Sequence, residues 1–190
     1  MREGAERRSD DEGVDMPQER TEADVRAEVQ RRLEEIEQLR EQHQRQGLAF
    51  AALSEEGLAQ KIRGETSNSP FFYYQAWVAA TTPGNSAYVE IGYQNPDPTY
   101  RHVCVTIFFG LANFAADITA AAAGRHVGWP YVSDSPTIVG IGQTGTAKFN
   151  YTTPMVEPGT YLGNAVLWRP PPTFGIGSYF DRSLFEIRLI

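Results

Sequence analysis

Apolar and polar positions alternate along the last two-thirds of the chain, in short runs separated by Gly, Pro and Asn turn clusters. A period of two predicts half-buried strands. The run at 102–109 (HVCVTIFF) is the most apolar and β-branched, so we expect it at the centre of a sheet. Segment 110–136 is ambiguous, either two short strands or a strand and one helical turn. The strands expected from the pattern cover 71–81, 86–93 (pairing with 71–81 as a hairpin), 102–109, 137–141, 146–151 and 183–190, and 156–168 is expected to be a turn followed by a strand from Tyr161.

A helical period is confined to the first third of the chain. Thr21 to Asp24 has the form of a capping box, strong helix formers continue to about Gln46, and Gly47 is a natural terminator. The apolar positions of this helix form a narrow stripe on a charged surface: Val25, Val29, Leu33, Ile36 and Leu39.

Two interpretations of the stripe remain open. The helix packs by one edge on the globular domain, or it forms a short parallel coiled coil that joins copies of the chain. Only about three heptads are present, and Arg32 or Arg40 intrudes at seam positions, so a coiled coil would need help from the globular domains. We take the five stripe residues as the candidate oligomerisation helix.

The chain then divides into three regions. Residues 1–20 are polar and predict a disordered acidic tail, and residues 21–65 form a helical stalk and connector. Within the connector, Ser54 begins a second, weaker helix with Leu58 and Ile62 on one side, which we expect to dock on the sandwich or on a neighbouring subunit. Residues 66–70 mark the boundary of a β-rich domain that runs to residue 190.

The segment Pro158-Gly159-Thr160-Tyr161, followed by a strand to Trp168, resembles the penultimate strand of immunoglobulin-like and fibronectin-III-like sandwiches. The resemblance implies that Tyr161 hydrogen-bonds back to the preceding corner. About seven strands spaced by turns predict an antiparallel two-sheet β-sandwich, immunoglobulin-like or jelly-roll-like. Such a fold hosts many unrelated functions and does not select one.

Charge and composition narrow the function classes. Residues 1–65 contain 11 Lys/Arg and 17 Asp/Glu, whereas residues 66–190 contain 6 and 7. The absence of a basic patch argues against nucleic acid as a partner. No apolar run approaches the ~20 residues of a membrane span, and no signal peptide is evident, which favours a cytoplasmic or particle-associated location. The single Cys104 excludes an intrachain disulfide.

Candidate chemistry is sparse. His102 and Cys104 lie two apart and share one strand face, but only His126, Asp117 and Asp134 are suggestive as further metal ligands. No nucleophile motif surrounds Cys104, and no pair of acids stands out as general acid and base. We therefore expect no metal, no cofactor and no enzymatic activity. An enzyme that uses Cys104 or His102 is the second alternative.

Aromatic residues are the more informative group. Adjacent pairs such as Phe71-Phe72 cannot both face one core in a regular strand, so some should emerge and offer a contact surface. The candidates for this surface are Phe72, Tyr74, Trp129 and Tyr179. We predict a non-enzymatic structural protein that associates with itself, and possibly with another protein, through the helix and these surfaces. The alternative is a carbohydrate-binding module that stacks sugars on Trp129, Tyr131 and Tyr179.

Overall fold

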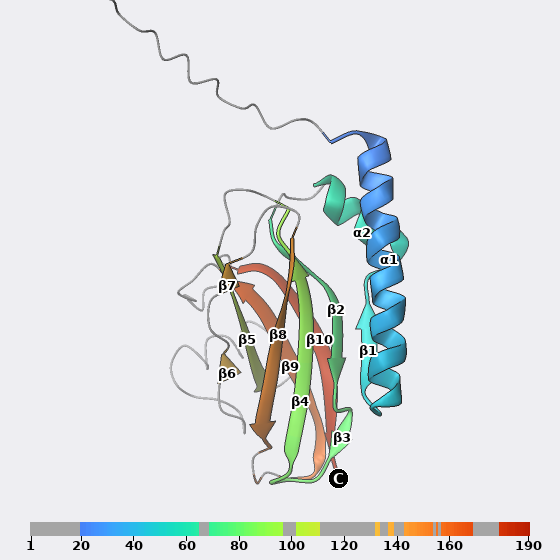
Figure 1. The fold of residues 1–190 in the computed structure, drawn as a ribbon. Helices are drawn as coiled ribbons and strands as arrows, with labels where there is room; N and C mark the ends of the chain where they lie inside the picture. Colours follow the sequence, from blue (N-terminus) through green and yellow to red (C-terminus); the bar gives the residue numbers. More distant parts are fainter. Residues whose placement is uncertain are drawn as a thin grey trace, which may run out of the picture.

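The computed structural model describes residues 20–64, 69–96, 102–110, 132–133, 137–138, 143–153, 155, 157–168 and 179–190. These residues form two helices and ten strands (Figure 1). In chain order the elements are α1 (Glu22–Arg45), β1 (Ala49–Ala52), α2 (Glu55–Arg63), β2 (Phe71–Trp77), β3 (Ala80–Thr81), β4 (Ser86–Gln94), β5 (His102–Gly110), β6 (Val132–Ser133), β7 (Thr137–Ile138), β8 (Thr144–Thr152), β9 (Gly159–Trp168) and β10 (Tyr179–Leu189).

The strands form two sheets. A four-stranded sheet has the order β1-β2-β4-β8, and a larger sheet has the order β3-β10-β9-β5-β6, with β7 also paired to β5. All pairings are antiparallel except the short parallel contact between β3 and β10. The prediction of a two-sheet antiparallel β-sandwich preceded by a helix is confirmed. β5 has neighbours on both sides, as its apolar sequence predicted.

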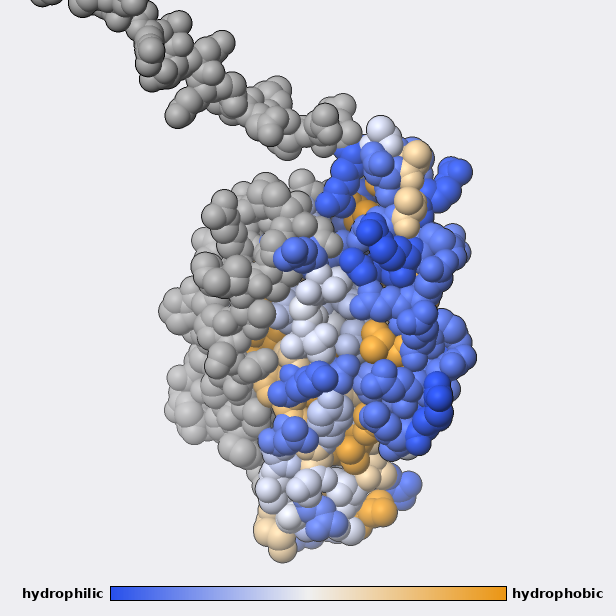
Figure 2. All heavy atoms as spheres, in the orientation of Figure 1, coloured by the Kyte–Doolittle hydropathy of each residue, from blue (hydrophilic) through white to orange (hydrophobic). Residues whose placement is uncertain are grey.

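Local signals position the helices. Thr21 caps α1 in a complete capping box with Asp24, and Ser54 caps α2 by accepting a hydrogen bond from the Gly57 amide at 3.1 Å. α2 ends at Gly64, which takes the left-handed conformation with φ of 71°. Both helices lie against the β1–β2 side of the sandwich, and the outward surface of α1 is hydrophilic (Figures 1 and 2). Neither described helix combines the length and apolar character needed to cross a bilayer.

Several strands differ from the prediction. The strand expected over 71–81 ends at Trp77, and Ala80–Thr81 form β3 in the other sheet. No strand was expected in the connector before the helix at Ser54, but residues Ala49–Ala52 form β1, which pairs with Trp77–Tyr74 of β2 and extends the four-stranded sheet. β10 begins at Tyr179 rather than Ser183, because Tyr179 and Asp181 already pair with Trp168 and Leu167 of β9. Residues 20–64 therefore contribute a strand to the sandwich as well as a helical cover.

Two apolar cores result, one between the sheets and one between the four-stranded sheet and the helices. β2 separates them, and a register shift lies between Phe72 and Tyr74. Phe72 packs in the core between the sheets, while Phe71, Tyr73 and Tyr74 pack in the core under the helices. Adjacent aromatics of β2 are thus all buried, because each face of the strand has its own cover.

The apolar stripe of α1 belongs to the second core. Val25, Val29 and Ile36 are at most 6% exposed, and Leu33 and Leu39 are partly buried beside them. The structure thus shows the first of the two interpretations, a helix packed by one edge on its own domain. This corrects the coiled-coil assignment of the five residues, since they cannot form a seam between copies while α1 lies on this sheet.

The corner before β9 confirms the expected tyrosine contact. The Tyr161 hydroxyl donates to the Glu157 carbonyl oxygen at 2.8 Å. At the other end of the same strand, the buried Trp168 indole donates to the Thr106 hydroxyl of β5 at 2.7 Å. The first contact closes the corner that leads into β9, and the second ties the far end of β9 to β5.

Candidate functional site

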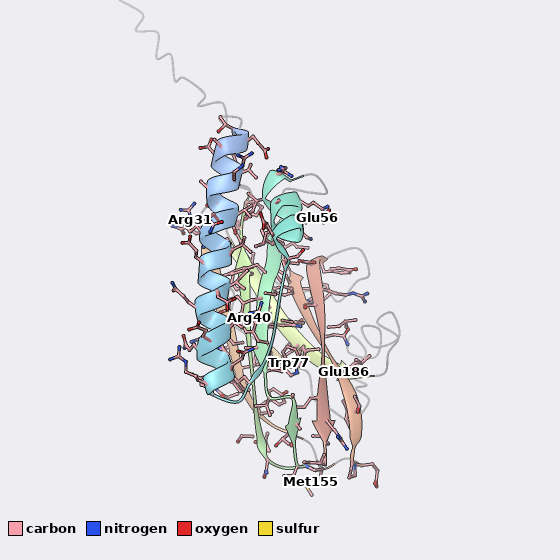
Figure 3. The ribbon with its side chains drawn as sticks, turned by 90° about the vertical axis from the view of Figure 1, so that its right-hand side faces the viewer. Arg31, Arg40, Glu56, Trp77, Met155 and Glu186 are labelled. Atoms are coloured by element: carbon pink, nitrogen blue, oxygen red, sulfur yellow. The ribbon has the colours of Figure 1, made fainter. Side chains whose placement is uncertain are left out.

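A layer of polar side chains lies within the interface between α1 and the four-stranded sheet. Its members are Glu28, Arg32, Glu35 and His43 from α1, and Tyr73, Tyr74, Tyr88, Glu90 and Gln94 from β2 and β4. We call these nine residues the polar layer. In Figure 3, α1 lies lengthwise beside the sheet, with Arg31 directed away from it and Arg40 directed toward it. The Arg40 guanidinium lies 5.1 Å from the centre of the Phe50 ring on β1.

The first centre of the polar layer surrounds Arg32, whose side chain is 10% exposed. Its guanidinium donates to Glu35 at 2.5 Å and to the Gln94 amide oxygen at 3.1 Å, and it lies 3.1 Å from Glu28. Gln94 in turn donates to Glu28 at 3.1 Å, and the Tyr73 hydroxyl donates to Glu35 at 2.8 Å. A cation is tolerated on the buried stripe because two carboxylates and one amide satisfy it.

We expect Arg32→Met to lower the free energy of unfolding by about 2 kcal/mol, because Gln94 and both carboxylates lose a charged partner. Arg31→Met is the matched control. Arg31 is the neighbouring residue, its side chain is 64% exposed, and its ion pair with Glu28 should be worth under about 0.5 kcal/mol. Urea titrations of both variants measure the difference. Equal effects of the two substitutions would contradict the role assigned to Arg32.

The second centre surrounds Glu90 on β4, whose side chain is 8% exposed. The hydroxyls of Tyr74 and Tyr88 donate to its two oxygens at 2.7 and 2.5 Å. His43 Nε2 lies 3.2 Å from Oε1, and Lys148 Nζ lies 3.7 Å from Oε2. Four groups that can donate therefore converge on one buried carboxylate.

His43 links this centre to α1. Its Nδ1 lies 2.7 Å from the Leu39 carbonyl oxygen, which can only accept, so Nδ1 carries a hydrogen. Its Nε2 faces the Glu90 carboxylate, which also accepts. The ring also packs against Phe50 and Tyr74, with centroid distances of 5.9 and 6.2 Å, and these two rings stack on each other at 5.8 Å.

The ionisation of this centre follows from its contacts. Burial raises the pKa of Glu90, but hydrogen bonds from Tyr88, Tyr74 and His43 outweigh it and hold the pKa below its ordinary value of 4.5. Burial raises the pKa of Tyr74 and of Tyr88, and the Glu90 carboxylate raises both further. The tyrosines therefore remain protonated donors and Glu90 remains an anion at neutral pH.

Chemically, the polar layer is suited to holding two elements together. Its ionisable groups bind one another across the helix–sheet interface, and His43 and Glu90 are nearly inaccessible to solvent. Within the described ranges, no group of three or more His, Cys, Asp or Glu side chains is arranged to bind a metal. The layer thus stabilises the position of α1 on the sheet.

A half-open cavity of about 140 Å³ adjoins the polar layer at Tyr73 and Tyr74, where β1 and β2 approach β10. Small side chains leave this space, namely Ala51 and Ala52 of β1 and Ser183 of β10. The Gln75 side chain also borders it and donates to the Leu184 carbonyl oxygen at 2.8 Å. The cavity marks the point where the two sheets are joined by side chains rather than by a strand.

The predicted interaction surface is only partly placed by the structure. Phe72 and Tyr74 are 5% and 4% exposed, so their assignment to a surface is wrong; the second sheet covers Phe72 and the helices cover Tyr74. Tyr179 is half-buried with its ring against Trp168, at a centroid distance of 6.0 Å. Trp129 and Tyr131, and with them the proposed sugar platform, lie outside the described residues.

The candidate catalytic pair is placed by its backbone alone. His102 and Cys104 lie in β5, two residues apart as expected, and their side chains lie outside the described part.

The polar layer was not predicted. A signal existed, because Arg32 and His43 continue the spacing of the apolar stripe and Glu90 stands within a strand otherwise expected to be half-buried.

Comparisons with known proteins assign no family. No family model matches the chain, and no curated protein matches its sequence. Similar solved structures include the CARDB domain of a Pyrococcus furiosus protein in complex with di-metal ions, at 14% identity and a TM-score of 0.40, covering 64% of this chain and 90% of that one. A cycloisomaltooligosaccharide glucanotransferase from Paenibacillus sp. has 14% identity and a TM-score of 0.39, covering 59% of this chain and 13% of that one.

A β-glucosidase from Listeria innocua has 12% identity and a TM-score of 0.37, with 75% of this chain and 16% of that chain covered. The chain therefore spans only a small part of both enzymes, and likenesses this weak carry no argument for their activities. The class that the structure itself defines is a two-sheet β-sandwich with a helical cover on one sheet.

Proposed function

We propose that the protein is a non-enzymatic structural module that associates with copies of itself through its β-sandwich. One observation supports the non-enzymatic part of the proposal: the buried charged groups described here fix α1 on the sheet. Arg32, Glu90 and His43 each bind partners on the opposite element, and the apolar stripe is buried with them. Side chains that would serve catalysis in an open cleft instead hold the fold together.

The apolar stripe of α1 is buried against the sheet of its own chain, so we expect the contact between copies to lie away from α1. The outward side of α1 is charged and hydrophilic (Figure 2), which suits contact with water better than a helix seam. Strands of the sandwich that lie far from α1 are the alternative surface. Self-association should therefore be insensitive to changes on the exposed face of the helix.

Light scattering on the full chain over a hundredfold range of concentration tests the proposal. We expect a defined oligomer whose mass is unchanged by Gln30→Ala and Gln38→Ala, two substitutions on exposed positions of α1. A mass equal to one chain at every concentration would overturn self-association. A mass that falls in the α1 variants would return the contact to the helix.

A further inference from the structure

The edge strands β10 and β8 differ in how their outward backbone groups are covered. On the β10 edge, side chains and short backbone contacts occupy the outward carbonyl and amide groups. Gln75 donates to Leu184 O at 2.8 Å, and the Trp77 indole donates to Glu186 O at 2.7 Å (Figure 3). Further along, the backbone amides of Arg188 and Ile190 donate to Ala79 and Thr81. This edge is covered against pairing with another strand.

The β8 edge has no such cover among the described residues. Asn95 N donates to Gln143 O, and Thr153 N donates to Asn85 O, which fixes the phase of the β4–β8 ladder. Odd-numbered residues of β8 therefore bond to β4, and even-numbered residues turn their N–H and C=O groups to the outer edge. These outward residues are Thr144, Thr146, Lys148, Asn150 and Thr152. Within the described ranges, no hydrogen bond reaches their outward backbone groups.

Among the described residues, the side chains of β8 also leave its outer edge uncovered. Ala147 and Phe149 point into the core, while Thr146, Asn150 and Thr152 are exposed, which is the alternation of a regular strand. Lys148 is the only charge on the strand, and Glu90 lies 3.7 Å from it. The one lysine that would discourage pairing is thus partly neutralised within its own chain. α1 and α2 lie on the β1–β2 side, away from β8 (Figure 1).

We propose that β8 pairs antiparallel with β8 of a second copy about a two-fold axis, which joins two four-stranded sheets into one sheet of eight. This inference rests on the proposed self-association and names its surface. A two-fold pairing is closed, and it satisfies both open edges with one segment. The partner strand must also carry apolar residues on its inner side, and β8 does so through Ala147 and Phe149.

Charge selects the register of this pairing. Alignment of Lys148 with Lys148 of the partner subunit places like charges directly opposite, which is destabilising. A shift of two residues in either direction places Lys148 opposite Thr146 or Asn150 of the partner subunit. Both shifts replace the Lys148–Lys148 contact with a neutral partner, so these two registers are the expected ones.

Asn150→Pro tests the inference. Residue 150 turns its N–H outward, so proline there removes a donor from the edge and none from the β4 ladder. We expect the dissociation constant of the dimer to rise at least tenfold, while Asn150→Ala, which keeps the N–H, leaves it unchanged within a factor of about two. Circular dichroism confirms that both variants retain the β fold.

Amide hydrogen exchange on the wild-type protein tests the same pairing without a substitution. Raising the concentration through the dissociation constant should slow exchange at Thr146, Lys148 and Asn150, and leave Ala147 and Phe149 unchanged. An oligomer in which neither the proline nor concentration affects these positions would overturn the β8 contact and leave self-association standing. A protein monomeric at every concentration would overturn both.

Discussion

Glu90→Gln should lower the free energy of unfolding by about 3 kcal/mol at pH 7. The carboxylate accepts from Tyr74 and Tyr88 on both oxygens and faces His43 Nε2 at 3.2 Å. Glutamine keeps the shape but offers one acceptor, so its amide nitrogen would face groups that donate. Removing one partner of a buried, hydrogen-bonded charge costs several kcal/mol because the other groups remain buried. Chemical denaturation followed by tryptophan fluorescence measures the loss.

Glu186→Gln is the matched control for this substitution. Glu186 also lies within a strand, but its side chain is exposed on the outer face of β10, and the change should alter stability by under about 0.5 kcal/mol. Equal stability of Glu90→Gln and wild type would show that the carboxylate does not hold α1 to the sheet.

Acid should remove the same contribution from the wild-type protein. The pKa of Glu90 in the folded state lies below its ordinary value of 4.5, so the unfolded chain takes up the proton first as pH falls. The stabilisation is present above pH 4.5 and is lost as pH decreases through the folded pKa. The difference in unfolding free energy between wild type and Glu90→Gln should therefore shrink below pH 4.5. A difference that stays constant from pH 7 to pH 3 would contradict the assignment.

The elements that were predicted correctly are those whose signals lie within one short stretch of sequence. The capping box at Thr21 sets the start of α1, and the alternation in 86–93 and 146–151 sets β4 and β8. β1 carries no such signal. Its sequence AFAA has neither alternation nor β-branched residues, and its strand conformation comes from pairing with β2.

The two wrong surface assignments have a common cause. Two adjacent aromatics on one strand predicted an exposed face, on the assumption that a strand has one buried side. Phe72 faces the second sheet, whereas Tyr74 faces a helix that precedes it by about thirty residues in the chain. The sequence pattern indicates that a strand face is apolar, but it does not indicate which distant element covers that face.

The helix stripe illustrates the same limit. Spacings of three and four residues are common to a coiled-coil seam and to a helix lying on a sheet. Arg32 was the discriminating residue. A guanidinium is costly in a dry seam, and here it is satisfied by Gln94 from the sheet and by Glu28 and Glu35 from its own helix. The partner Gln94 lies 62 residues away, so the sequence alone did not show it.

Gly163→Ala should be among the most destabilising single-methyl additions in the chain, with an expected loss of about 3 kcal/mol. Gly163 on β9 pairs directly with Phe185 on β10, and a Cβ at Gly163 would lie 2.3 Å from the Phe185 ring. Two other glycines, Gly92 and Gly145, lie beneath the rings of Tyr74 and Tyr93 in the same way. An aromatic ring that crosses a strand thus occupies the space that a side chain would take.

The Phe185 ring cannot yield easily, because it is 3% exposed and packs against Trp77 at a centroid distance of 5.7 Å. Gly159→Ala is the control on the same strand, where the new Cβ would meet its nearest atom at 3.8 Å, an ordinary contact. In the double variant Gly163→Ala/Phe185→Leu the smaller side chain relieves the clash, so the combined loss should fall short of the sum of the single losses by at least about 1 kcal/mol. Thermal and urea unfolding of the four proteins measure this coupling. Additive losses would mean that the strands separate to admit the methyl group and that the ring does not set the packing of β9 on β10.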